Sequence, residues 1–133
     1  MSFTLSIDIP GTSSQTYTVN WPQTANAQTL LELAYDQHTY PGSTTPFHFG
    51  LAFYGTPPSG FGYLVSTING TSETDSASGE YWQFLLNGQS SQYGIDETML
   101  NDGDTVEFEY SPYNPDLHGI TGPNARKAQV KAA

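Results

Sequence analysis

The stretch Ala27-Gln28-Thr29-Leu30-Leu31-Glu32-Leu33-Ala34 is the one part of the chain with a convincing helical period. Counted from Ala27, four of its apolar residues stand at positions i, i+3, i+4 and i+7, which places Ala27, Leu30, Leu31 and Ala34 on one face of a helix. Asn26, directly before the stretch, is the predicted N-cap, and Pro41 disfavours helix at the residue before it. The sequence therefore predicts one amphipathic helix that ends before Pro41.

The segments on either side of this helix have the period of strands. Residues 2–9 and 16–21 alternate apolar and polar positions around a turn at residues 10–14, which predicts a hairpin. After the helix, strands are predicted at residues 47–53, 61–68, 80–86 and 105–110, with Asn-Gly turns at 69–70 and 87–88. One helix packed on a mixed sheet is an α+β arrangement, and this order fits a β-grasp.

Two further structural predictions follow from the pattern. Periodicity stops after Tyr113, so we expect one domain over residues 1–113 and an extended tail over 114–133. The apolar faces of the helix and the strands should pack together in one core. Four residues are predicted to be buried there: Trp21, Leu31, Phe49 and Phe108.

Several of these segments also resemble a known family, a module of unknown function related to the C-terminal domain of transcobalamin and intrinsic factor. The resemblance rests on Tyr17-Thr18-Val19, on the helix at 30–34, on residues 81–88 with their Asn-Gly turn, on Gly94-Ile95, and on residues 100–106. It covers roughly residues 3 to 111. The resemblance implies a β-grasp fold and non-catalytic binding. In the cobalamin carriers a helical barrel domain, which this sequence lacks, holds most of the corrinoid.

Charge is distributed unevenly along the chain. All three basic residues, Arg126, Lys127 and Lys131, follow position 125, whereas the 13 acidic residues precede them. Separation of sign along a sequence is typical of a docking segment, and a body without Lys or Arg excludes nucleic acid as a partner. The leading hypothesis is therefore association with copies of the chain or with another protein, through the tail as a docking arm and including assembly into filaments. The arm would add to an open edge of the last strand, where Glu107 and Glu109 lie, and its apolar contacts would be Leu117, Ile120 and Val130.

The alternative function is small-molecule binding, with a corrinoid or a glycan as ligand. The chain has 16 Tyr and Phe and two Trp, and some of these rings should lie on the surface, where planar rings bind sugars, tetrapyrrole-like rings or proteins. Ordinary packing on the second face of the sheet is the competing explanation. The candidate ligand-binding residues are Trp82, Tyr81, Tyr54, Tyr63 and Tyr93.

Catalysis, metal binding and cofactors have little support in the sequence. His38, His48 and His118 lack the close spacing of zinc sites, and residues 101–104 are explained by a turn rather than by a cation loop. Glu107 and Glu109 share a strand face at about 7 Å, which could suit glycoside cleavage, but an acidic solvent face is the commoner reason for such a pair. We expect a non-enzyme without metal or cofactor. The polar, weakly charged composition predicts an extracellular or surface location, although no signal peptide and no membrane span is visible.

Overall fold

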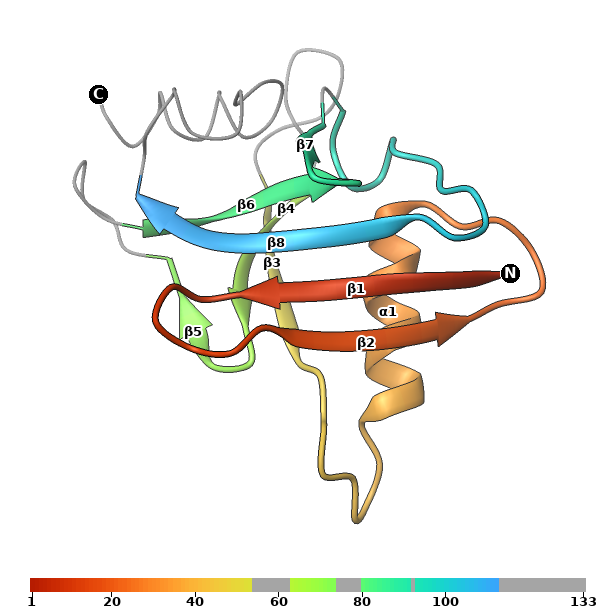
Figure 1. Ribbon diagram of the computed structural model, residues 1–133, viewed down its shortest axis with the longest axis horizontal. Helices are drawn as coiled ribbons and strands as arrows, with labels where there is room; N and C mark the ends of the chain where they lie inside the picture. The colour runs from red at the N-terminus through yellow and green to blue at the C-terminus, as the bar shows by residue number, and fades with distance from the viewer. Residues whose placement is uncertain (54–62, 74–79, 92, 113–133) are drawn as a thin grey trace.

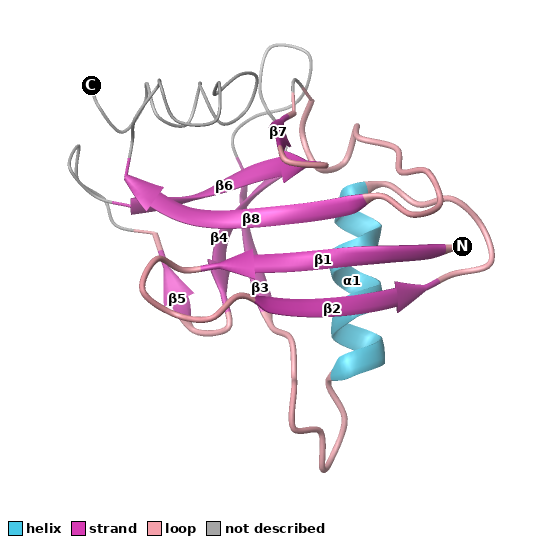
Figure 2. Cartoon of the chain, viewed as in Figure 1, coloured by secondary structure: helices cyan, strands magenta, loops and turns pink. Residues whose placement is uncertain are grey.

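The computed structural model describes residues 1–53, 63–73, 80–91 and 93–112, which form two sheets and one helix (Figures 1 and 2). The five-stranded sheet has the order β2-β1-β8-β6-β7 and the three-stranded sheet the order β3-β4-β5. In chain order the elements are β1 (Ser2–Asp8), β2 (Gln15–Asn20), α1 (Ala27–His38), β3 (Phe49–Phe53), β4 (Tyr63–Ile68), β5 (Thr71–Ser72), β6 (Glu80–Leu86), β7 (Gln89–Ser90) and β8 (Thr105–Pro112). The predicted α+β class is confirmed.

The five-stranded sheet is mixed because its first and last long strands lie side by side. β1 is antiparallel to β2 but parallel to β8, with Leu5 opposite Val106 and Asp8 opposite Glu109. β6 then pairs antiparallel with the other side of β8. As a result β8 is an interior strand, and the edges of this sheet are β2 and β7. The prediction that Glu107 and Glu109 lie on an open edge is wrong, since both sides of β8 are paired along the residues concerned.

The helix forms where the sequence predicts it. The Asn26 side chain accepts a hydrogen bond from the Thr29 amide at 2.7 Å, so it caps the first turn. At the other end, the Thr39 amide bonds to the Tyr35 carbonyl before the chain turns at Pro41. The stripe that packs on the sheet consists of Ala27, Leu30, Leu31, Leu33 and Ala34, all buried.

One hydrophobic core lies between α1, the inner face of the large sheet and the small sheet. Leu31 and Phe108 are buried in it as predicted. Trp21 and Phe49 are only partly buried and pack at its margin, which corrects the prediction for these two. Trp21 follows the last residue of β2 and Phe49 is the first residue of β3, so solvent reaches one side of each ring.

The two Asn-Gly turns have the backbone that the hairpin prediction requires. Asn69 and Gly70 have φ angles of 48° and 86°, and Asn87 and Gly88 have 51° and 82°. Positive φ at both central residues matches the right-handed twist of the flanking strands. The first of these turns places the Asn69 side chain beside β2, where it contributes to the site described below.

Some sequence predictions concern residues outside the described part of the chain. The boundary between residues 1–113 and the tail 114–133 is one of them, and residues 61–62 of the strand predicted at 61–68 are another. Within the described residues, no helix is long and apolar enough to cross a membrane.

Candidate functional site

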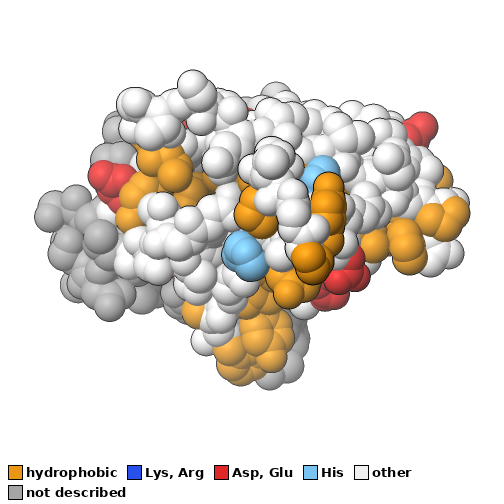
Figure 3. Space-filling view, turned by 90° about the horizontal axis from the view of Figure 1, so that it is seen from below, with side chains coloured by type: hydrophobic (Ala, Val, Ile, Leu, Met, Phe, Trp, Pro, Cys, Tyr) orange, Lys and Arg blue, Asp and Glu red, His pale blue; other side chains and the backbone are white. Residues whose placement is uncertain are grey.

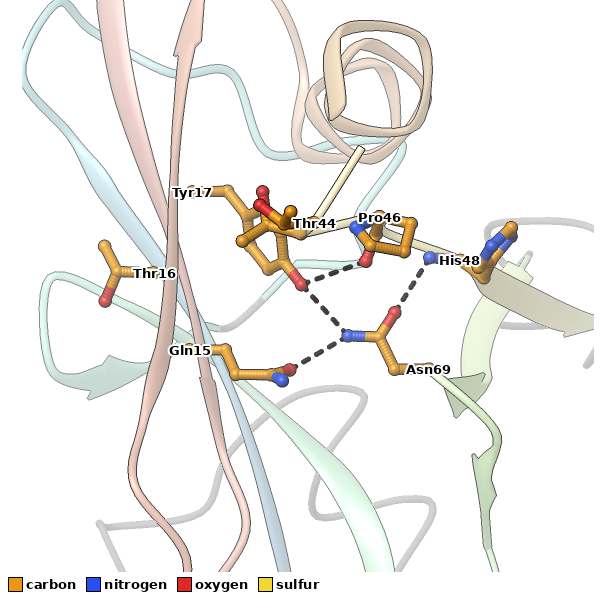
Figure 4. A pocket seen from close by; sticks show the side chains of 8 residues that line it. Gln15, Thr16, Tyr17, Thr44, Pro46, His48 and Asn69 are labelled. Carbon is orange, nitrogen blue, oxygen red and sulfur yellow. Dashed lines mark hydrogen bonds between the residues drawn. The ribbon is translucent and has the colours of Figure 1, made fainter. Parts of the chain in front are cut away.

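A groove of about 410 Å³ opens between the first half of β2, the segment that leads into β3, and the turn after β4 (Figure 4). Its volume falls in the range of about 300–1,000 Å³ that small-molecule sites occupy. None of its lining residues carries a formal charge when histidine is neutral: Gln15, Thr16, Tyr17, Thr44, Thr45, Pro46, His48 and Asn69.

One wall of the groove is the part of an edge strand that the helix leaves uncovered. Further along β2, Gln37 of α1 receives a hydrogen bond from the Asn20 amide at 3.2 Å and donates to the Asn20 carbonyl at 2.7 Å. The His38 ring nitrogen Nε2 lies 2.9 Å from the Thr18 carbonyl oxygen. Helix side chains thus occupy the outward groups of two alternate residues. Thr16, the next residue on the same side of the strand, borders the groove instead.

The floor of the groove is fixed by the amide of Asn69. Its Nδ2 donates to Gln15 Oε1 at 2.9 Å and to the Tyr17 hydroxyl at 3.1 Å. Its Oδ1 accepts from the His48 amide at 2.9 Å, while the Tyr17 hydroxyl donates to the Pro46 carbonyl at 3.3 Å. One side chain therefore ties β2 to the beginning of β3, as the dashed lines in Figure 4 show. A network with partners on three segments holds the groove in one shape.

Around the groove the surface combines rings with polar groups. The Tyr35 ring, 44% exposed, lies edge-on to the His48 ring with centroids 5.8 Å apart. Seen from below, the described histidines lie among hydrophobic side chains, and acidic side chains stand at the margins (Figure 3). Donors, acceptors and apolar edges without a formal charge suit a neutral ligand that is rich in hydroxyl or amide groups.

The aromatic residues proposed from the sequence are distributed over several places. Tyr63 and Tyr93 are exposed, at 44% and 59%, and Tyr63 pairs with the exposed ring of Phe53 at 5.1 Å. Tyr81 and Trp82 are buried, which corrects the expectation that they offer surface rings. Trp82 packs in the core and donates from its ring nitrogen to the Thr71 carbonyl at 2.9 Å. Tyr54 lies outside the described residues, and in the described part no ring contact joins Tyr63 to Tyr93.

Of the residues proposed for partner binding, only Glu107 and Glu109 belong to the described part of the chain. The tail residues lie outside the described part of the chain: Leu117, Ile120, Arg126, Lys127, Val130 and Lys131. Glu107 and Glu109 lie on the face of β8 that points away from α1, since they alternate with the core residues Val106 and Phe108. The pair is therefore on the outer face of the sheet and is not among the residues that line the groove.

A carboxyl pair on that face has unusual acidity. A hydrogen bond to Asp8, burial, and the negative charges of Asp8 and Glu109 raise the pKa of Glu107 to about 7. The same hydrogen bond, together with one from Ser14, lowers the pKa of Asp8. Burial and the negative charges of Glu73 and Glu109 raise the pKa of Tyr81 on the neighbouring strand. Of the two carboxyl groups, Glu107 is therefore the one that keeps its proton to the higher pH.

Potential metal ligands are scattered over the described part of the chain. Among the residues that the structure describes, no group of three His, Cys, Asp or Glu side chains could hold a metal ion. His38 faces β2 and His48 borders the groove, while His118 lies outside the described residues.

The groove residues were missed by the sequence analysis. Gln15 and Asn69 are 54 positions apart, so no local motif connects them. The one signal available was the Asn69-Gly70 turn, which fixes the backbone of Asn69. Which strand that turn would meet depends on the packing of the two sheets.

The family of the chain is decided by a sequence match. A family model described as a domain of unknown function, DUF4430, matches residues 25–112. The chain belongs to this family. The match spans α1 and all the strands that follow it, including β8. No curated protein matches the DUF4430 chain in sequence.

Two solved structures share the fold of this DUF4430 domain. A proposed metal-binding protein from Ruminococcus gnavus has a TM-score of 0.62 at 14% identity and covers 84% of this chain and 96% of its own. Haptocorrin in complex with Cbi has a TM-score of 0.61 at 17% identity, over 86% of this chain. The chain spans only 26% of the haptocorrin chain. At these identities the likeness shows the fold alone, and it agrees with the transcobalamin-like resemblance seen in the sequence.

Proposed function

We propose that this chain is a non-catalytic binding domain whose groove beside β2 takes a neutral, polar small molecule. The observation that carries the proposal is the uncharged lining of that groove, which three hydrogen bonds of Asn69 hold in shape. A preformed site with a few converging hydrogen-bonding groups is the usual form of a small-molecule site. The strand order, in which a hairpin and a helix precede strands that pack beside β1, supports assignment of the domain to the β-grasp.

Two ligand classes match this chemistry. A corrinoid is supported by the Cbi that haptocorrin holds, although the shared part is a minor share of that protein. A glycan is supported by the exposed ring of Tyr35 beside His48, because a sugar can stack on such a ring while its hydroxyls bond to amides in the groove. Both ligands would bind without reaction, since the carboxyl groups of Glu107 and Glu109 do not line the groove.

The test is calorimetric titration of the protein with Cbi and, separately, with a series of neutral oligosaccharides. Thr45→Arg places a long charged side chain in the groove, and Gln89→Arg places the same group on exposed β7 as a matched control. We expect one probe to bind, with its Kd raised at least ~10-fold by Thr45→Arg, about 1.4 kcal/mol, and unchanged by Gln89→Arg. Absence of binding to both probes, or equal loss in both variants, would refute the groove as the site.

Association between copies is kept as a second proposal, in a narrower form that does not use residues 114–133 as the docking arm. Because β8 is an interior strand, residues 114–133 cannot add to its edge. Association between copies would make particle size grow with concentration in light scattering. An extracellular or surface location likewise remains a prediction, to be checked by fractionation of the producing cells.

A further inference from the structure

The face of the large sheet that points away from the helix is buried along β6. Tyr81, Gln83 and Leu85 alternate with the core residues Trp82 and Phe84, so they point to the opposite face. Such a face is normally solvated in an antiparallel arrangement. These three side chains are nevertheless only 0%, 0% and 1% exposed. Figure 1 shows α1 and the small sheet on the other side, and no described helix or strand lies over this face.

Gln83 supplies independent evidence that something belongs there. Its Oε1 accepts long hydrogen bonds from the Tyr81 hydroxyl at 3.4 Å and from Ser111 Oγ at 3.5 Å. Its Nε2 is buried and has no partner. Buried polar atoms are almost always hydrogen-bonded. In this orientation of the amide, the donor of Gln83 has no acceptor among the described residues.

The same face is acidic at its centre. Asp8 stands opposite Glu109 in the β1–β8 ladder and shares a hydrogen bond with Glu107. Three carboxyl groups thus gather over two adjacent strands. The chain contains three Lys and Arg residues, all at positions 126–131, so none belongs to the described part. Carboxyl groups that crowd one another in this way are stabilised by a neighbouring cation.

We propose that residues 113–133 cover this face of their own chain, with the basic residues over the carboxyl cluster and a backbone carbonyl accepting from Gln83 Nε2. The segment begins directly after Pro112, next to buried Ser111, so its start lies at the border of the face. Its 21 residues are long enough to cross several strands, at up to about 3.3 Å per residue. Leu117, Ile120 and Val130 are the apolar groups available to pack on Tyr81 and Leu85.

The segment that covers the face could come from the same chain or from a second copy, and its attachment to the same chain favours the first. A segment joined by a short linker acts at an effective concentration in the millimolar range, above that of a separate protein in dilute solution. The inference is independent of the ligand groove, which lies at the edge of β2. It concerns the acidic face alone.

The absence of cysteine from the chain allows a direct test. The full-length protein carries Ser6→Cys on the outer face of β1 and Ala128→Cys in the basic segment. It is treated with a short bis-maleimide, which links two cysteines that lie close together. The matched control pairs Ala128→Cys with Glu32→Cys, which is exposed on α1. Circular dichroism confirms that each variant is folded, and gel electrophoresis with mass spectrometry separates cross-links within one chain from those between chains.

We expect a cross-link within the chain for the Ser6 pair, with a yield that is independent of protein concentration and falls several-fold in the control. Changing Arg126, Lys127 and Lys131 together to Glu should reduce the yield to that of the control. Cross-links mainly between chains would show that a second copy occupies the face. Equal yields in both pairs would show that the segment does not dock there. Either result overturns the proposal.

Discussion

The groove beside β2 and the acidic face over β1, β8 and β6 are both polar, but they are polar in opposite ways. The groove is lined by uncharged groups whose hydrogen bonds to one another are complete at Asn69. The acidic face carries three carboxyl groups and a buried amide with an unused donor at Gln83. A site whose hydrogen bonds are complete is stable without a ligand. A buried donor without an acceptor destabilises the fold, so we expect the surface around it to be covered.

Both regions rest on one core, and the largest expected effect comes from disturbing it. Leu31 is fully buried between α1 and the sheet. Leu31→Ala should lower the free energy of unfolding by about 2–5 kcal/mol, through lost burial and the cavity that remains. Urea denaturation, followed by fluorescence and by circular dichroism, should show one transition. Two separate transitions would mean that the groove and the acidic face do not share a core.

The groove should be more sensitive at Asn69 than elsewhere in its lining. Asn69→Ala removes hydrogen bonds to Gln15, Tyr17 and the His48 amide, and forces a side chain with a Cβ but no amide into a φ of 48°. We expect a loss of about 1–3 kcal/mol. Asn69→Gly relieves the backbone cost and isolates the hydrogen bonds, so it should cost less. If Gly costs as much as Ala, the positive φ contributes nothing.

On the acidic face, Gln83→Met tests whether the side-chain amide of Gln83 has a hydrogen-bond acceptor. Met has a similar shape and no donor. In the full-length chain the substitution should cost about 0.5–1.5 kcal/mol, because the cover supplies an acceptor to Gln83 Nε2. If the donor is truly unpaired, replacing it should leave the protein equally or more stable. Thermal unfolding of the two proteins at matched concentration measures the sign.

The smallest effect is a pH dependence that only the acidic face should show. The pKa of Glu107 is about 7 in the folded chain against a usual 4.5, so the folded state holds this proton more tightly than the unfolded state. Its contribution to stability is therefore fully present below pH 4.5 and is lost as the pH rises to about 7. Glu107→Gln should flatten the melting temperature over that interval. Asn69→Gly, in the groove, should leave the slope as it is.

The fold could be predicted to a useful extent because its signals are local. The period of residues 27–34, the cap at Asn26 and the Asn-Gly turns each depend on neighbours a few residues away. The class followed from their order. The interior position of β8 did not, since a strand with alternating acidic residues has the same pattern at an edge as in the interior of a sheet. For the same reason, Tyr81 and Trp82 could not be distinguished from surface rings.

The site was beyond sequence analysis because its residues meet only through tertiary packing. Gln15 and Asn69 touch because β2 is an edge strand and the β4–β5 turn ends beside it. Nothing in either segment specifies the other. Rings and charges attract attention in a sequence, but the groove is built from Thr, Gln and Asn, which are common in this chain and serve in turns and surfaces as well.

The most direct measurement of the central claim is an amide NMR titration of labelled full-length protein with Cbi and with a neutral oligosaccharide. The account predicts that one probe shifts the amides of Thr16, Thr45 and Asn69 in a saturable manner, while those of Gln83 and Glu109 stay in place. Saturable shifts confined to the acidic face, or none with either probe, would contradict a neutral ligand in the groove beside β2.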